Sequence, residues 1–73
     1  MPTLNDLMIG ATATVVKLTG EAGVKRRLLE MGLTPATKLE LIRRAPLGDP
    51  LEIKVRNFHL SLRRDEAACI EIV

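Results

Sequence analysis

The chain has 73 residues, of which 47% are apolar and 27% charged, and its formal net charge is +2. A chain of this length buries only about 60% of the surface that its unfolded form exposes, so few residues remain to line an internal ligand cavity. Aromatic residues make up 1% of the sequence, and Phe58 is the single example, so the core must be aliphatic. This composition argues against a buried cofactor site, and we expect no cofactor.

Three features of the sequence bear on cellular location. No stretch approaches the roughly 20 apolar residues of a membrane-spanning helix, and the first residues lack the basic and apolar regions of a secretory signal. Cys69 is the one cysteine, so the chain cannot form an internal disulfide, which agrees with a reducing compartment. We therefore expect a single cytoplasmic domain over residues 1–73.

The first elements in chain order are a helical turn and a strand. Residues 3–7 predict a short helical turn that Thr3 caps. Residues 11–18 are rich in Thr and Val, whose branched side chains suit a pleated surface, and they predict a strand.

Residues 21–31 predict the one substantial helix. Its apolar stripe would consist of Val24, Leu28 and Met31 at helical spacing, widened by Leu29. We expect Thr19 or Gly20 to cap the start of this helix, and Gly32 to end it in the left-handed conformation.

After Pro35 the apolar residues recur at every second position, which is the pattern of half-buried antiparallel strands. It predicts strands over residues 38–42, 51–56, 58–63 and 69–72.

Two short connections join the last of these strands. A tight turn at 56–58 would place Asn57 at positive φ. A helical turn capped by Asp65 would precede the last strand.

These elements predict a mainly β fold of about five short strands and one short α-helix. The economical arrangement is a small, partly open barrel, which also protects the strand edges. Its inner face would be filled by Val15, Leu39, Leu41, Ile53, Val55, Leu60, Leu62, Ile70 and Ile72.

The inventory of reactive side chains argues against an enzyme. His59 and Cys69 fall on different predicted strands, and no third group or oxyanion site accompanies them. His59 with Glu52 or Asp49 would bind a metal only adventitiously, because zinc and iron sites need more ligands in close spacing. We expect no catalytic residues and no metal site.

Three arginine pairs, at 26–27, 43–44 and 63–64, raise the question of nucleic-acid binding. Successive strand residues point to opposite faces of a sheet, so the last two pairs are split between faces. Acidic residues are interspersed, and Phe58 alone provides no stacking platform. The pattern favours solvated surface charge, and a nucleic-acid-binding small barrel stays as the alternative.

Three ordered segments together resemble a known family. They are residues 26–35 (RRLLEMGLTP), 44–51 (RAPLGDPL) and 60–67 (LSLRRDEA) followed by Ile70. In this order and spacing they resemble the ferrous iron transport protein A (FeoA) family. The same module resembles the C-terminal SH3-like domain of iron-dependent repressors, so an isolated repressor domain is a second alternative.

The resemblance implies an SH3-like barrel in the cytoplasm. It implies a non-catalytic accessory protein that binds and modulates the membrane iron transporter FeoB, whose cytoplasmic part includes a GTP-binding domain. We expect no nucleic-acid partner, and weak self-association stays open. One departure is visible at Pro35-Ala36, where the family usually has Pro-Gly. Ala36 tolerates positive φ poorly, so this turn is expected to differ or to carry strain.

Five residues are the candidates for partner binding: Arg26, Glu30, Arg44, Pro46 and Leu47. Arg26 and Glu30 lie one helical turn apart, so they either pair with each other or form a docking flank. Leu47 sits between Pro46 and Gly48 in a loop, where it either folds back as a lid on the barrel or projects as an apolar anchor. The lid is the slightly favoured interpretation.

Overall fold

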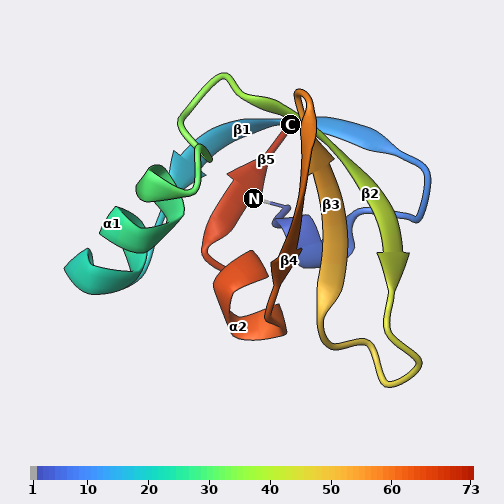
Figure 1. Cartoon of the computed structure of the whole chain (residues 1–73). Helices are drawn as coiled ribbons and strands as arrows, with labels where there is room; N and C mark the ends of the chain where they lie inside the picture. Colours follow the sequence, from blue (N-terminus) through green and yellow to red (C-terminus); the bar gives the residue numbers. More distant parts are fainter. Residues whose placement is uncertain (1) are drawn as a thin grey trace.

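The computed structural model describes residues 2–73, which form one five-stranded antiparallel sheet with two helices and a 3-10 turn (Figure 1). The elements in chain order are η1 (Leu4–Asp6), β1 (Thr12–Leu18), α1 (Ala22–Glu30), β2 (Lys38–Arg44), β3 (Leu51–Val55), β4 (Phe58–Leu62), α2 (Arg64–Ala67) and β5 (Ile70–Ile72). The strands lie in the order β4-β3-β2-β1-β5. The mainly β prediction is therefore confirmed.

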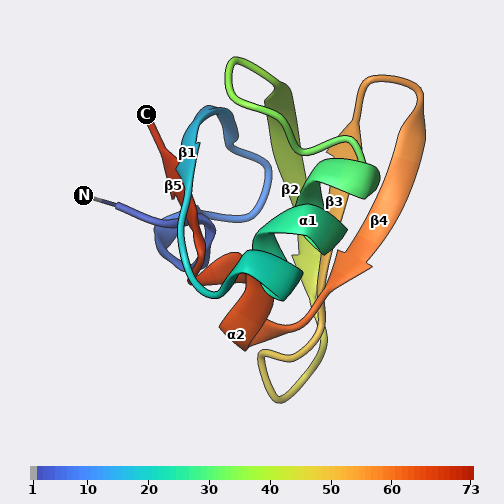
Figure 2. The same ribbon diagram turned by 90° about the vertical axis from the view of Figure 1, so that its left-hand side faces the viewer.

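The sheet curls because β1 pairs with different neighbours along its length. Thr12–Thr14 pair with β2, whereas Val15–Leu18 pair with β5 and shift register between Val15 and Lys17. Such a bulge bends a strand and increases its twist. β4 and β5 are left at the two edges of the sheet, so the barrel is partly open, as predicted. Figure 2 shows α1 in front of this opening, between β1 and β4.

The N-terminal segment pairs with β5 at one edge of the sheet. The amide of Ile72 in β5 donates to the Pro2 carbonyl at 3.0 Å, and Thr3 forms a bridge with Glu71. The N-terminal segment therefore covers the edge of β5, which removes a surface on which another strand would pair.

The aliphatic core follows the predicted alternation. Eight of the nine residues assigned to the inner face are buried, and Leu60 is half-buried. The core also takes in residues that the strand pattern did not include: Leu4, Ala13, Leu18, Leu28, Leu33, Leu51 and Ala67. Leu4, Leu28 and Ala67 come from η1, α1 and α2, so these three short elements close the barrel with apolar side chains.

The two ends of α1 differ in how well the sequence predicts them. The N-cap is Glu21, and no side chain caps the helix, so the expected cap at Thr19 or Gly20 is wrong. Gly32 ends the helix at φ 94°, as predicted. The Leu33 amide donates to the Leu28 carbonyl at 3.1 Å. This bond spans five residues along the chain and is the 6→1 hydrogen bond of a Schellman motif. Leu28 and Leu33 are both fully buried, so this motif fixes the end of α1 on the core.

The apolar stripe of α1 is narrower than predicted. Leu28 is buried, Val24 and Met31 are partly buried, and Leu29 is 44% exposed. Each helical residue is rotated by about 100° from the one before it, so Leu29 points away from the face that Leu28 buries. The assignment of Leu29 to the core stripe is wrong.

The turn after α1 keeps its shape despite the alanine. Ala36 has φ 76°, and the Thr37 amide donates to the Thr34 carbonyl at 3.1 Å. This is a turn with proline at its second position and positive φ at its third, where glycine is favoured. The Ala36 amide also donates to the Val15 carbonyl at 2.7 Å, which ties the turn to β1. Of the two expectations, the strained turn is the one observed.

Two local predictions are wrong. In the turn between β3 and β4 the positive φ of 54° falls on Arg56 rather than on Asn57. Arg63, not Asp65, is the N-cap of α2. The Arg63 amide donates to Glu66 Oε1 at 3.0 Å, so the carboxylate that organises this end of α2 comes from inside the helix.

Candidate partner-binding surface

The side chains of α1 point in four directions, which follow from the 100° rotation per residue. Leu28 faces the core. Arg27 lies on the flank toward α2, and Lys25 and Leu29 share the flank toward β1. Arg26 points outward, away from the buried face. One short helix therefore presents a separate surface to each neighbour and one to solvent.

Arg26 and Glu30, two of the predicted contact residues, lie on the outward face of α1 and are exposed. Of the two interpretations, pairing with each other is not observed, because the ion pairs within residues 2–73 join Arg27 to Glu66 and Arg43 to Glu52. Both charged groups are therefore free to meet another molecule.

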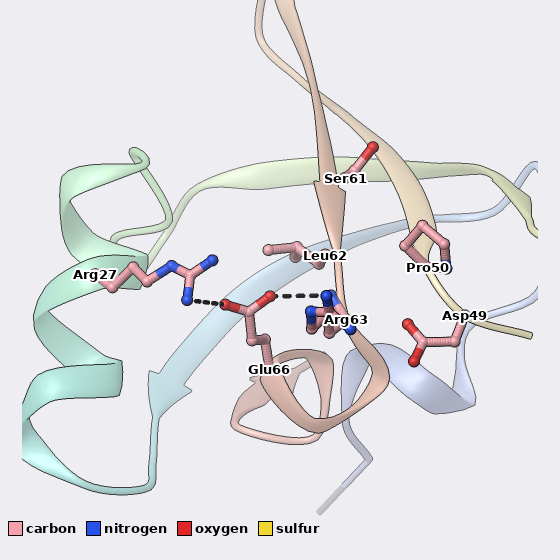
Figure 3. Close-up of a pocket in the computed structure, with 7 residues that line it drawn as sticks. All are labelled: Arg27, Asp49, Pro50, Ser61, Leu62, Arg63 and Glu66. Atoms are coloured by element: carbon pink, nitrogen blue, oxygen red, sulfur yellow. Dashed lines mark hydrogen bonds and ion pairs between the residues drawn. The ribbon is translucent and has the colours of Figure 1, made fainter.

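Arg27 and Glu66 form the contact between α1 and α2. Arg27 Nη1 lies 3.2 Å from Glu66 Oε2, and the two side chains are 67% and 9% exposed, respectively. Figure 3 shows Arg27 reaching from α1 to Glu66, with Arg63 on the other side of the carboxylate. A pocket of about 310 Å³ opens at this place. Both oxygens of Glu66 are occupied, by Arg27 and by the Arg63 amide, so the carboxylate serves the fold rather than a ligand.

Arg44 holds the N-terminal segment onto β2. Its Nη2 donates to the carbonyl oxygens of Asn5 at 2.8 Å and of Leu7 at 2.9 Å, and the side chain is half-buried. Charged donors make the stronger hydrogen bonds of a fold. Arg44 is one of the predicted contact residues, but in the structure its guanidinium group binds two carbonyl oxygens of the same chain.

Leu47 lies at the tip of the β2–β3 loop and is 91% exposed. The loop closes on itself, because the Ala45 amide donates to the Pro50 carbonyl at 3.0 Å and the Gly48 amide to the Ala45 carbonyl at 2.7 Å. Leu47 is thereby held away from the barrel end, and the lid interpretation is wrong. Pro46 beside it is also exposed.

The predicted contact residues do not form one surface. In Figure 1, α1 and the loop between β2 and β3 lie on opposite sides of the barrel. The outer face of α1 with Arg26 and Glu30 and the loop tip with Pro46 and Leu47 are therefore two separate exposed regions.

The remaining polar candidates are spread over the fold. His59 lies opposite Lys54 on the paired strands β4 and β3, and Glu52 is engaged with Arg43. Within residues 2–73 no group of three or more His, Cys, Asp or Glu side chains is placed to hold a metal ion. In the same residues no helix is long and apolar enough to cross a membrane.

With this geometry established, comparison with known proteins places the chain in a family. A family model described as the FeoA domain matches residues 3–73. The chain belongs to the FeoA family. The resemblance carried by the three ordered segments is thereby confirmed.

Two solved FeoA structures share the fold over nearly all of the chain. FeoA from Chlorobium tepidum is 39% identical with a TM-score of 0.90, covering 97% of this chain and 68% of that one. FeoA from Stenotrophomonas maltophilia, solved with zinc and described as a prokaryotic SH3 domain protein, is 26% identical with a TM-score of 0.82. That match covers 100% of this chain and 91% of the other. The SH3-like fold is confirmed.

A curated relative joins a FeoA module to a transporter. The Fe(2+) transport protein A/Fe(2+) transporter FeoB fusion protein of Porphyromonas gingivalis is 35% identical over 69 residues. The match covers 94% of this chain, and the chain spans only 8% of that relative.

Proposed function

We propose that this FeoA-family chain is a non-catalytic accessory protein of ferrous iron uptake, which binds and modulates a membrane transporter of the FeoB type. The observation that carries the proposal is the fusion of a FeoA module to FeoB in Porphyromonas gingivalis. A covalent link keeps two modules at high effective concentration, and it is useful where the separate modules associate. The FeoA of Stenotrophomonas maltophilia has also been put forward as a ferrous iron transport activating factor.

A non-catalytic role agrees with where the reactive side chains lie. His59 is near the start of β4, and Cys69 stands between α2 and β5, where its thiol donates to the Asp65 carbonyl at 3.5 Å. Glu66 is buried and bonded on both oxygens. We infer that this module acts by binding alone, as one domain in the cytoplasm, where it meets the cytoplasmic part of the transporter.

Two exposed regions are the proposed contacts. The first is the loop tip, where Leu47 offers an apolar anchor on a loop that is already closed by its own hydrogen bonds. A preorganised loop loses little conformational entropy on binding. The second is the outer face of α1, where Arg26 and Glu30 are exposed with no ion pair between them. Charges of this kind affect the rate and specificity of association more than its strength.

The proposal is tested by measuring binding and transport together. The full chain is titrated onto the purified full-length transporter of its own organism, and radioactive ferrous iron uptake is measured in cells with and without the gene for this chain. We expect saturable binding and reduced uptake in the deletion strain, restored by the gene. Absence of both effects would refute the proposal.

A further inference from the structure

An apolar groove of about 390 Å³ lies between β1 and α1, on the side of α1 opposite to Glu66. It is lined by Val16, Lys17, Leu18, Lys25, Leu29 and Pro35. Its residues come from β1, from α1 and from the turn that follows α1, so the groove exists only in the folded chain.

Two apolar side chains are left open in this groove. Val16 follows the buried Val15 on the opposite face of β1, and it is 39% exposed. The register of β1 against β5 shifts between Val15 and Lys17, and Lys17 is exposed as well. Leu29 is 44% exposed because it lies on the flank of α1 rather than on its buried face. Leu18, which also lines the groove, is nearly buried. The barrel core is complete without the outer parts of Val16 and Leu29, which are available to an added apolar group.

The charges at the groove have one sign. Lys17 and Lys25 line it, and no acidic residue does. Within residues 2–73 neither lysine is in an ion pair, since the ion pairs formed involve only arginines. Glu71 is the cross-strand partner of Lys17 but does not line the groove, so the two lysines give the groove itself a positive rim.

We propose that this groove is the docking site for a segment of the transporter that presents an apolar side chain flanked by carboxylates. The inference rests on the proposed function and adds a third contact surface, beside the loop tip and the outer face of α1, together with the chemistry of that contact. The apolar side chain would cover Val16 and Leu29, and the carboxylates would meet Lys17 and Lys25. An apolar centre with a charged rim is the usual anatomy of a protein contact.

An anionic membrane surface is a less suitable occupant. A basic residue near such a surface contributes only about 1 kcal/mol, and stable attachment needs a cluster of four or more. The groove supplies two lysines and a recessed apolar floor, which fits a side chain better than a plane of headgroups.

The test compares matched charge changes inside and outside the groove. Leu29→Glu and Lys25→Glu alter its apolar floor and its rim. Ile9→Glu and Lys54→Glu make the same chemical changes at exposed positions that do not line the groove. The dissociation constant of each full-length variant for the full-length transporter is measured at two salt concentrations, and thermal unfolding verifies that each variant folds.

We expect Leu29→Glu to weaken binding by about tenfold or more. Lys25→Glu should weaken it several-fold and reduce its salt dependence, and both control variants should bind within about twofold of the original chain. If the original chain binds and the groove variants bind equally well, the groove is refuted while the proposed function stands. If the original chain does not bind the transporter, both the groove assignment and the proposed function are refuted. The groove assignment is also refuted if Leu29→Glu abolishes binding to phosphatidylserine vesicles or self-association instead of binding to the transporter.

Discussion

Arg27 on α1 and Glu66 on α2 are joined by an ion pair of 3.2 Å, although they are far apart in the sequence. The same carboxylate accepts the Arg63 amide at 3.0 Å, so Glu66 both orders the start of α2 and holds α1 beside it. The position of α1 in turn creates the two flanks of the helix, one toward α2 and one toward the groove at β1. A single buried carboxylate thereby supports the proposed docking surface.

Replacing Glu66 with alanine should lower the free energy of unfolding by about 1–3 kcal/mol, because the part-buried Arg63 amide and the Arg27 side chain lose their acceptor. Arg27→Ala should cost less than about 1 kcal/mol, because that side chain is 67% exposed and solvent screens the pair. Urea unfolding of both variants measures the difference. An equal loss in the two variants would show that the ion pair, and not the Arg63 amide bond, is the main contribution of Glu66.

Replacing Ala36 with glycine should stabilise the fold by about 0.5–1 kcal/mol. At φ 76° an alanine carries a left-handed penalty of roughly 1–2 kcal/mol, and the greater flexibility of unfolded glycine offsets part of the gain. The midpoint of urea unfolding measures the effect. Ala22→Gly, at the start of α1, serves as the control and should destabilise by up to about 1 kcal/mol. A lower midpoint for Ala36→Gly would contradict the observed strain.

Leu47→Glu should leave the free energy of unfolding within about 0.5 kcal/mol of the original, because the side chain is 91% exposed. Leu33→Ala, at a fully buried position, should cost about 2–5 kcal/mol. Thermal unfolding distinguishes the two. Binding of Leu47→Glu to the transporter then tests whether Leu47 is an apolar anchor. Weaker binding by the stable variant would support this role, and unchanged binding would exclude it.

Nucleic-acid binding should be weak and nearly independent of sequence. Arg27, Arg43 and Arg44 are engaged within the fold, by Glu66, by Glu52 and by two backbone carbonyls. Binding to duplex DNA and to RNA at about 50 and 200 mM salt measures this property. Tight binding that falls steeply with salt would revive the nucleic-acid-binding barrel as the function.

The sequence predicted most of the fold because its signals are local. Strict alternation in residues 51–56 determines a half-buried strand, and eight of the nine inner-face residues are buried. Gly32 marked the end of α1 correctly, since few other residues adopt φ 94° without strain. The family resemblance likewise depends on the sequence alone, because it rests on three segments that occur in a given order and spacing along the chain. The errors at Asn57, Asp65 and the start of α1 lie at turns and caps, where several neighbouring residues satisfy the same local rule.

Sequence by itself thus determined a small, aliphatic, mainly β barrel of the FeoA family, because burial patterns and turn residues act over a few positions. Only the tertiary structure decided what the side chains do between elements. Leu47 projects because its loop closes on itself, and Arg44 turns inward because η1 brings two carbonyls to it. Leu29 and Val16 line one groove because the fold places α1 beside β1. Such contacts join residues distant in the chain, and no local pattern encodes them.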